Sequence, residues 1–273
     1  MPFTESEKIR IYYEDIGAGE PALLLMPGWC DSRTEFHAFR EECSKHRRTI
    51  IIDWRGHGKS EKPKNDFGFN ELVKDALSVI EATSVNNIIP VSITNSSWVS
   101  IELLQKLGSR IPKLIFKDWL VLQPPLLYID TLRSLQDPKQ WESTREQLFQ
   151  TWLSGVNNPD AIKLVREIMA AHDFEMWSRA ARAIIFMYKK FGSPLQLLDS
   201  FESHVPVLHV YSQPNESGYL ESQETFAESH EWFNVIKLKT PSHFFTLEKP
   251  KESAALLEKF IRGDSLDSYR TAI

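Results

Sequence analysis

Three short segments of this 273-residue chain carry groups that could move a proton or hold an anion. Residues 92–96 (SITNS) place the hydroxyl group of Thr94 after an apolar run, and residues 241–244 (PSHF) place the imidazole of His243 after another. Residues 27–30 (PGWC) offer backbone N–H groups after a third run. A hydroxyl group, a base and paired N–H donors are the groups that proton-transfer and acyl-transfer sites combine.

His243 is the predicted general base. It follows the strand-like run at residues 234–240, and a histidine there can reach a cleft and take a proton near neutral pH. The alternative interpretation is a loop histidine satisfied by solvent or backbone. His57, within residues 55–58 (RGHG), is interpreted as a structural turn residue.

Asp118 is the predicted partner of that base, because a carboxylate bonded to the distal ring nitrogen fixes the histidine tautomer and stabilises the imidazolium ion. It follows the strand-like residues 114–116. Glu216 is the alternative, as the nearest carboxylate after the next strand. A third interpretation is a surface aspartate paired with Lys117 or Lys113.

Thr94 occupies the turn from strand to helix at which hydrolases place a nucleophile. Threonine is β-branched, so a positive φ angle costs it more than serine, and its hydroxyl group is hindered for attack. We therefore expect Thr94 to bind a ligand rather than to attack one. The backbone N–H groups of Trp29 and Asn95 are expected to form an oxyanion hole, the second of them at a helix N-terminus.

The elements that position these residues alternate along the chain. Near-continuous apolar runs predict strands buried on both faces, and hence an α/β fold with a mostly parallel, doubly wound sheet. The predicted strands are residues 21–27, 48–54, 87–93, 113–120, 205–211 and 234–240, with residues 8–14 as an antiparallel edge. The predicted helices are residues 69–83, 96–108 and 250–262. In such a sheet ligands bind at the carboxyl ends of the strands, where every candidate residue lies.

Residues 123–202 interrupt this alternation. They read as successive helices without a strand-like run and are rich in large aromatic residues such as Trp152 and Trp177. We predict a helical cap over the carboxyl edge of the sheet, inserted into an α/β core made of residues 1–122 and 203–273. Aromatic residues at helical spacing belong to the core more often than to a ligand site.

Composition excludes several classes of protein. The formal net charge of -5 provides no basic surface for nucleic acid. No run of about 18 apolar residues predicts a membrane span, and the charged N-terminal segment lacks the apolar stretch of a signal peptide. Two cysteines, Cys30 and Cys43, are too few for a disulfide scaffold, so we expect a soluble cytoplasmic protein.

The order of the segments, from N–H donor loop to elbow to late histidine, is that of the α/β-hydrolase fold. The chain resembles, nearly from end to end, the cofactor-independent 2,4-dioxygenases of 3-hydroxy-4(1H)-quinolones, which have this fold. The motifs that carry the resemblance are residues 27–30 (PGWC), 53–60 (DWRGHGKS), 66–68 (DFG), 73–77 (VKDAL), 90–92 (PVS), 97–99 (SWV), 118–120 (DWL), 137–138 (DP), 152–153 (WL), 192–194 (GSP), 212–214 (SQP) and 241–244 (PSHF). The tryptophan-containing motifs are more specific than the general hydrolase motifs.

The resemblance implies an enzyme that needs no metal and no flavin. A histidine takes the proton of the substrate 3-hydroxyl group, and the anion reacts with O₂, with ring cleavage to carbon monoxide and an N-acyl-anthranilate. His243 would be the base and Asp118 its orienting partner. Thr94 would bind the substrate hydroxyl group, Trp29 would lie in the oxyanion region, and Trp152 would be a cap tryptophan near the substrate. The implied partners are a small aromatic substrate and O₂.

Besides Thr94, which stands at the position of the elbow serine, four positions depart from the family pattern. In the elbow, Ile93 and Asn95 replace two histidines and Ser96 replaces a glycine, and Asp31 replaces the histidine that follows PGWC. These are substrate-binding positions, and an aspartate there opposes a substrate anion unless it points away or is protonated. Two alternatives to the dioxygenase follow: an esterase-like hydrolase with Thr94 as nucleophile, and a non-catalytic ligand-binding protein.

Overall fold

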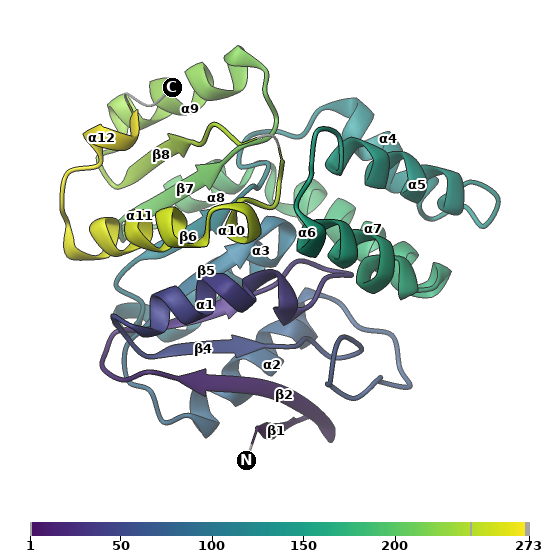
Figure 1. Ribbon diagram of the computed structural model, residues 1–273, viewed down its shortest axis with the longest axis horizontal. Coiled ribbons are helices and arrows are strands. Elements are labelled where there is room, and N and C mark those ends of the chain that lie inside the picture. The colour runs from purple at the N-terminus through teal and green to yellow at the C-terminus, as the bar shows by residue number, and fades with distance from the viewer. Residues whose placement is uncertain (1, 241, 271–273) are drawn as a thin grey trace.

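The computed structural model describes residues 2–240 and 242–270 of the chain. Its strands are β1 Phe3–Ser6, β2 Ile9–Ile16, β3 Ala22–Met26, β4 Thr49–Ile52, β5 Ile88–Ile93, β6 Leu114–Lys117, β7 Val207–Tyr211 and β8 Phe233–Lys237. They form an eight-stranded sheet in the order β1-β2-β4-β3-β5-β6-β7-β8 (Figure 1). Neighbouring strands from β4 to β8 pair in parallel, whereas β2 is antiparallel to both β1 and β4. The predicted α/β fold with a mostly parallel sheet is confirmed.

The N-terminal strands correct one expectation. The segment predicted at residues 8–14 is antiparallel, but it is not the edge of the sheet, because Phe3 of β1 pairs with Tyr12 of β2. β1 has only four residues, FTES, which is too short for an alternating pattern to be recognised. β6 also ends earlier than predicted. Asp118 has a φ angle of 44°, outside the extended region, and this ends the strand at Lys117.

Helices cover both faces of the sheet, as a doubly wound fold requires. They are α1 His37–Ser44, α2 Phe69–Ala82, α3 Ser97–Leu107, α9 Ser217–Ser229, α10 Phe245–Glu248, α11 Pro250–Arg262 and α12 Asp267–Arg270. α1 packs on α11 on one face, and α2 packs on α3 on the other (Figure 1). Three of these helices, α2, α3 and α11, were predicted from their spacing of apolar residues. α1 was not, because its short sequence HAFREECS buries only Phe39 and Cys43.

Between β6 and β7 the described chain forms helices and turns. The helices are α4 Leu126–Ser134, α5 Trp141–Trp152, α6 Pro159–Lys163, α7 Phe174–Phe191 and α8 Pro194–Asp199. α4 and α5 pack against α7, and α6 contacts α10 of the core. Figure 1 shows α4, α5, α6 and α7 grouped at one end of the sheet. We keep residues 123–202 as a proposed cap on a core of residues 1–122 and 203–273.

A buried ion pair fixes the loop that follows β4. Arg55 donates from Nη2 and Nε to the carboxylate of Asp75 on α2, at 2.6 and 2.9 Å. Both side chains are almost fully buried. The same loop carries His57, whose Nε2 atom accepts a hydrogen bond from the Cys30 N–H group at 3.0 Å. The ion pair therefore supports the loop after β3, which belongs to the predicted site.

Replacing Asp75 with alanine tests this support. The Asp75→Ala variant leaves the buried guanidinium of Arg55 with only the half-exposed carboxylate of Glu7, at 3.3 Å, and loss of one partner of a buried pair costs about 3–5 kcal/mol. We expect the free energy of unfolding, measured with urea, to fall by about that amount. Lys74→Ala is the matched control, because the exposed side chain of Lys74 pairs with Glu7 at the surface, and its effect should be much smaller. Equal losses in both variants would contradict the assignment.

Candidate active site

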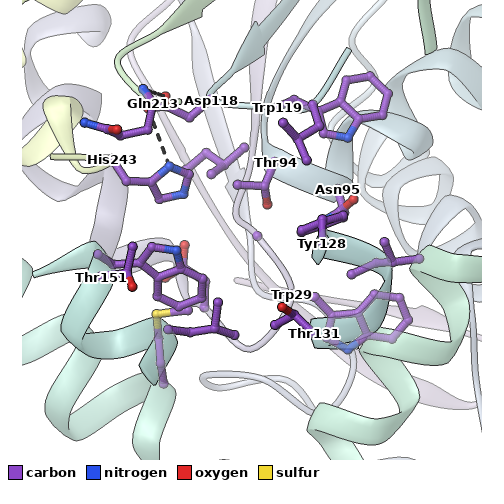
Figure 2. A pocket seen from close by; sticks show the side chains of 18 of the residues that line it. Trp29, Thr94, Asn95, Asp118, Trp119, Tyr128, Thr131, Thr151, Gln213 and His243 are labelled. Carbon is purple, nitrogen blue, oxygen red and sulfur yellow. Dashed lines mark hydrogen bonds and ion pairs between the residues drawn. The ribbon is translucent and has the colours of Figure 1, made fainter. Parts of the chain in front are cut away.

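A cavity of about 690 Å³ lies between the carboxyl ends of the strands and the cap helices. Its walls come from the loops after β3, β5, β6, β7 and β8 and from α4, α5 and α7. The eight residues predicted from the sequence all line it: Trp29, Asp31, Ile93, Thr94, Asn95, Asp118, Trp152 and His243. Figure 2 shows His243 on one side of the cavity and Thr94 and Asn95 on the other.

His243 and Asp118 lie next to each other at one end of the cavity. The His243 Nδ1 atom is 3.7 Å from Asp118 Oδ2, an ion-pair distance rather than a short hydrogen bond. Asp118 is fully buried, and Oδ1 accepts from the N–H groups of Ser212 at 2.7 Å and Gln213 at 3.1 Å. Glu216 also lines the cavity, but its side chain is exposed and forms no ion pair with the histidine. The geometry thus favours Asp118 over Glu216 as the carboxylate partner of His243.

Burial sets the charges of this pair. It lowers the pKa of His243 to about 4, and the ammonium group of Lys117 contributes in the same direction. Burial also raises the pKa of Asp118 to about 7, against the lowering effects of Lys117 and of the Ser212 and Gln213 N–H groups. His243 is therefore neutral at neutral pH, the state in which a base accepts a proton.

Thr94 forms the strained turn between β5 and α3. Its φ angle is 48°, in the left-handed region that is costly for a β-branched residue. Within the described residues its hydroxyl group forms no hydrogen bond, to His243 or to any other group. Gly28 faces it, since a Cβ atom at position 28 would lie 3.1 Å from Thr94 Oγ1. A free hydroxyl group without a bonded base fits ligand binding better than nucleophilic attack.

The loop after β3 presents the first predicted oxyanion donor, the Trp29 N–H group. In the described chain no turn or loop carbonyl accepts from it. The next residue, Cys30, has a φ angle of 63° and is held by its hydrogen bond to His57. His57 is buried outside the cavity lining, and its Nδ1 atom is bonded to the Arg55 carbonyl group at 2.9 Å, which supports the structural role interpreted for it. The second donor is the Asn95 N–H group, in the first helical turn, where N–H groups lack intrahelical partners.

Asp31 is buried at the cavity, with 3% of its surface exposed. Its Oδ1 atom accepts from the Ser32 N–H group at 2.6 Å. Burial raises the pKa of Asp31 well above its usual value, and the neighbouring carboxylate of Glu35 raises it further. Both effects favour the protonated form of the carboxyl group, which would not repel a substrate anion.

Glu35 and Lys117 form a buried ion pair beside Asp31, which the sequence analysis missed. Burial alone would raise the pKa of Glu35, but Lys117 and the hydrogen bond with Asp31 outweigh it and lower that pKa. Lys117 was considered as a surface partner for Asp118, and Lys113 as another. Lys117 instead pairs with Glu35, and Lys113 donates to the Phe260 carbonyl group.

Only some of the aromatic residues of the cap line the cavity. The Trp152 ring stacks on His243, with ring centroids 6.1 Å apart and planes 16° from parallel. Trp177 also lines the cavity. The other aromatic residues of the cap noted in the sequence do not line the cavity: Trp141, Phe149, Phe174, Phe186 and Tyr188.

Several polar residues of the cavity were not predicted. They are Glu35, Tyr128, Thr131, Thr151 and Gln213. Tyr128 and Thr131 belong to α4, where the spacing of apolar residues does not reveal the inward face. Leu126 and Leu127 of that helix are 81% and 78% exposed, whereas Leu132 is buried.

Neither a membrane-spanning helix nor a cluster of metal ligands occurs in the part of the chain that the structure describes. Among residues 2–240 and 242–270, no helix has the length and apolar character needed to cross a membrane. Within the same residues, no three histidine, cysteine, aspartate or glutamate side chains are grouped so that they could hold a metal ion.

Comparison with known proteins extends these observations. The profile of the α/β-hydrolase fold matches residues 21–92. A 2-heptyl-3-hydroxy-4-quinolone dioxygenase of Rhodococcus erythropolis is 33% identical over 236 residues, which are 86% of this chain and 84% of the relative. The 1H-3-hydroxy-4-oxoquinoline 2,4-dioxygenase of Pseudomonas putida is 32% identical over 256 residues, which are 93% of this chain and 97% of the relative.

A solved structure shows the same similarity in three dimensions. It is that of a variant of the dioxygenase AqdC in complex with its substrate, the Pseudomonas quinolone signal. The TM-score is 0.91 at 27% sequence identity, and the match covers 96% of this chain and 98% of the other. The similarity therefore includes the helices between β6 and β7 as well as the sheet.

The raised pKa of Asp31 predicts a pH-dependent contribution to stability. Because its pKa is higher in the folded chain than the unfolded value of about 3.9, the folded state binds the extra proton. The stabilisation is complete below about pH 4 and is lost as the pH rises towards the folded pKa, by up to about 1.4 kcal/mol per pH unit. An Asp31→Asn variant keeps the shape of the protonated acid without this titration.

We therefore expect the free energy of unfolding of Asp31→Asn, relative to the unsubstituted protein, to rise between about pH 5 and about pH 8. Urea unfolding at both pH values measures this difference. Asp264→Asn, at an exposed position, controls for the loss of one charge. A difference that does not depend on pH would mean that Asp31 is ionised in the folded protein.

Proposed function

Because the chain belongs to the family of 3-hydroxy-4-quinolone 2,4-dioxygenases with the α/β-hydrolase fold, we propose that it cleaves the ring of a 2-alkyl-3-hydroxy-4(1H)-quinolone with O₂. The observation that carries this proposal is the neutral imidazole of His243, which faces the cavity beside Asp118. A neutral base in an enclosed site can remove the proton of a substrate hydroxyl group without a cofactor.

His243 takes the proton of the 3-hydroxyl group and becomes an imidazolium ion. Asp118, 3.7 Å from Nδ1, stabilises that ion and approaches it as the charge forms. The negative charge left on the substrate spreads over its 3- and 4-oxygens. The N–H groups of Trp29 and Asn95 and the hydroxyl group of Thr94 are the proposed donors to these oxygens.

The electron-rich anion then reacts with O₂. One atom of O₂ becomes bonded to C2 and the other to C4, the C2–C3 and C3–C4 bonds and the O–O bond break, and C3 leaves with its own oxygen as carbon monoxide. The remaining product is an N-acyl-anthranilate, so every atom of substrate and O₂ is accounted for. The chain supplies the base, the donors and a largely apolar enclosure.

The cap wall of the cavity supports an alkyl substituent at C2 of the substrate. Its apolar side chains are Leu132, Leu135, Leu148, Met169 and Ile184. Ala180 and Ala181 on α7, which also line the cavity, are small. A volume of about 690 Å³ is within the range of cavities that enclose a drug-sized ligand.

An oxygen-electrode assay tests the reaction. Purified protein is expected to consume O₂ and release an equal amount of carbon monoxide with one or more quinolones from a panel of 2-alkyl chain lengths. His243→Ala removes the base and should lower kcat/KM by about 10²–10⁴-fold. His46→Ala, at an exposed position, is the control and should retain activity. Full activity in His243→Ala, or no uptake with any quinolone, would contradict the proposal.

Mass spectrometry and ligand binding, alongside the O₂ assay, separate the dioxygenase from the two alternatives. A hydrolase that uses Thr94 as nucleophile would form an acyl-enzyme, visible by mass spectrometry and abolished in Thr94→Ala. For the dioxygenase we expect Thr94→Ala to retain turnover within about tenfold, because it loses one hydrogen bond to the substrate. A non-catalytic protein would bind a quinolone without O₂ uptake, and His243→Ala would leave that binding intact.

The pH dependence of kcat/KM tests the role of Asp118. Its pKa is raised to about 7 by burial, and only the ionised carboxylate stabilises the imidazolium ion. We therefore expect kcat/KM to rise with pH through about 7 and then to level off. Asp118→Asn should lower the plateau by on the order of 10²-fold and abolish this rise. A rise that persists in the variant would belong to the substrate instead.

A further inference from the structure

Two polar side chains meet on the cavity wall opposite His243. The Nδ2 atom of Asn95 donates a hydrogen bond to the Tyr128 hydroxyl oxygen at 3.1 Å, and Figure 2 shows the two side by side. Asn95 comes from the elbow after β5, and Tyr128 from the first turn of the cap helix α4. Core and cap thus share one polar contact at the substrate cavity.

This contact leaves polar groups that the described protein does not satisfy. Tyr128 accepts the hydrogen bond from Asn95, and its own O–H group donates to no other group within the described residues. The Oδ1 atom of Asn95 is buried, has no partner there, and belongs to a residue with 8% of its surface exposed. Polar groups in an enclosed site are rarely left unpaired, so the undonated O–H group of Tyr128, which lines the cavity, is available to a polar acceptor of a ligand.

The phenol is suited to donate. Burial raises the pKa of Tyr128 to about 12, and the hydrogen bond from Asn95 acts in the opposite direction. The hydroxyl group therefore keeps its proton at neutral pH. Because Asn95 occupies a lone pair of the hydroxyl oxygen, the proton of that group is directed away from the amide.

We propose that the Tyr128 hydroxyl group donates a hydrogen bond to the 4-oxo oxygen of the bound quinolone, and that Asn95 positions it. This inference rests on the proposed function. The 4-oxo oxygen shares the negative charge formed when His243 removes the 3-hydroxyl proton, and hydrogen bonds to charged acceptors are stronger than those to neutral ones. Tyr128 would then be a specificity-determining residue supplied by the cap, next to the proposed N–H donor of Asn95.

Tyr128→Phe removes only the hydroxyl group. Under anaerobic conditions, where no turnover occurs, the absorbance of a 2-alkyl-3-hydroxy-4(1H)-quinolone reports whether the bound ligand is neutral or anionic. We expect Tyr128→Phe to weaken binding of the anion about tenfold and to raise the pH midpoint of ligand ionisation by about one unit, since a tenfold preference for one ionisation state equals one pH unit. In air, kcat/KM should fall by a similar factor.

Tyr188→Phe is the matched control. Tyr188 packs edge-to-face on Tyr128 at 6.3 Å, but its hydroxyl group already donates to the Leu120 carbonyl group at 2.8 Å. Its loss should lower the thermal stability and leave the ionisation midpoint of the ligand unchanged. For Asn95 as a positioning residue, Asn95→Ala should move the midpoint in the same direction, and the double variant with Tyr128→Phe should differ little from Tyr128→Phe alone.

An unchanged midpoint and affinity in Tyr128→Phe, with a quinolone bound by the unsubstituted protein, would overturn the inference and leave the proposed function standing. Equal shifts in Tyr128→Phe and Tyr188→Phe would also overturn it, because a general effect on the cap would then explain both. Failure of the unsubstituted protein to bind any quinolone anaerobically would overturn the proposed function and this inference with it.

Discussion

The removal of ionisable groups from water beneath the cap is the constraint on which the rest of the site depends. A buried charge is costly unless it is paired or neutralised, and each group here meets that requirement in its own way. Burial favours the neutral forms of His243 and Asp31, Glu35 and Lys117 form an ion pair, and Asp118 accepts hydrogen bonds from backbone N–H groups. The ionised Glu35 is thus balanced by Lys117, and Asp118 is held by backbone N–H groups next to the base.

Backbone geometry brings these groups to one place. Cys30, Thr94 and Asp118 follow β3, β5 and β6, and all three have positive φ angles. Each such residue costs about 1–3 kcal/mol and persists only where its surroundings hold it. The hydrogen bonds of Cys30 to His57 and of Asp118 to Ser212 are such supports. The strain is repeated at three parallel strand ends because tight turns there direct side chains and N–H groups into the cavity.

The core of the site was predictable because sheet topology determines it. Parallel buried strands end at one edge, so residues after them, such as Thr94, Asp118 and His243, could be brought together from the sequence alone. No comparable topological rule predicts which residues of the cap face the cavity. α4 exposes Leu126 while Tyr128 faces the cavity, and helical spacing alone does not tell one apolar face from the other. The pairing of core residues distant in sequence, such as Glu35 with Lys117, leaves no local pattern either.

The positions that depart from the family pattern show the same difference between the core and the cap. By the resemblance, Asp31, Ile93 and Asn95 stand at positions where the family pattern has histidines. All three line the same cavity as His243 and Asp118. Protonation makes Asp31 compatible with an anion, and Asn95 contacts Tyr128 of the cap. In the proposed reaction, proton removal depends on His243 and Asp118 at the strand ends, whereas the wall beside the substituent at C2 comes from the proposed cap. In that proposal, cap residues other than Trp152, which stacks on His243, can change the substrate preference without disturbing the base, because they belong to different elements.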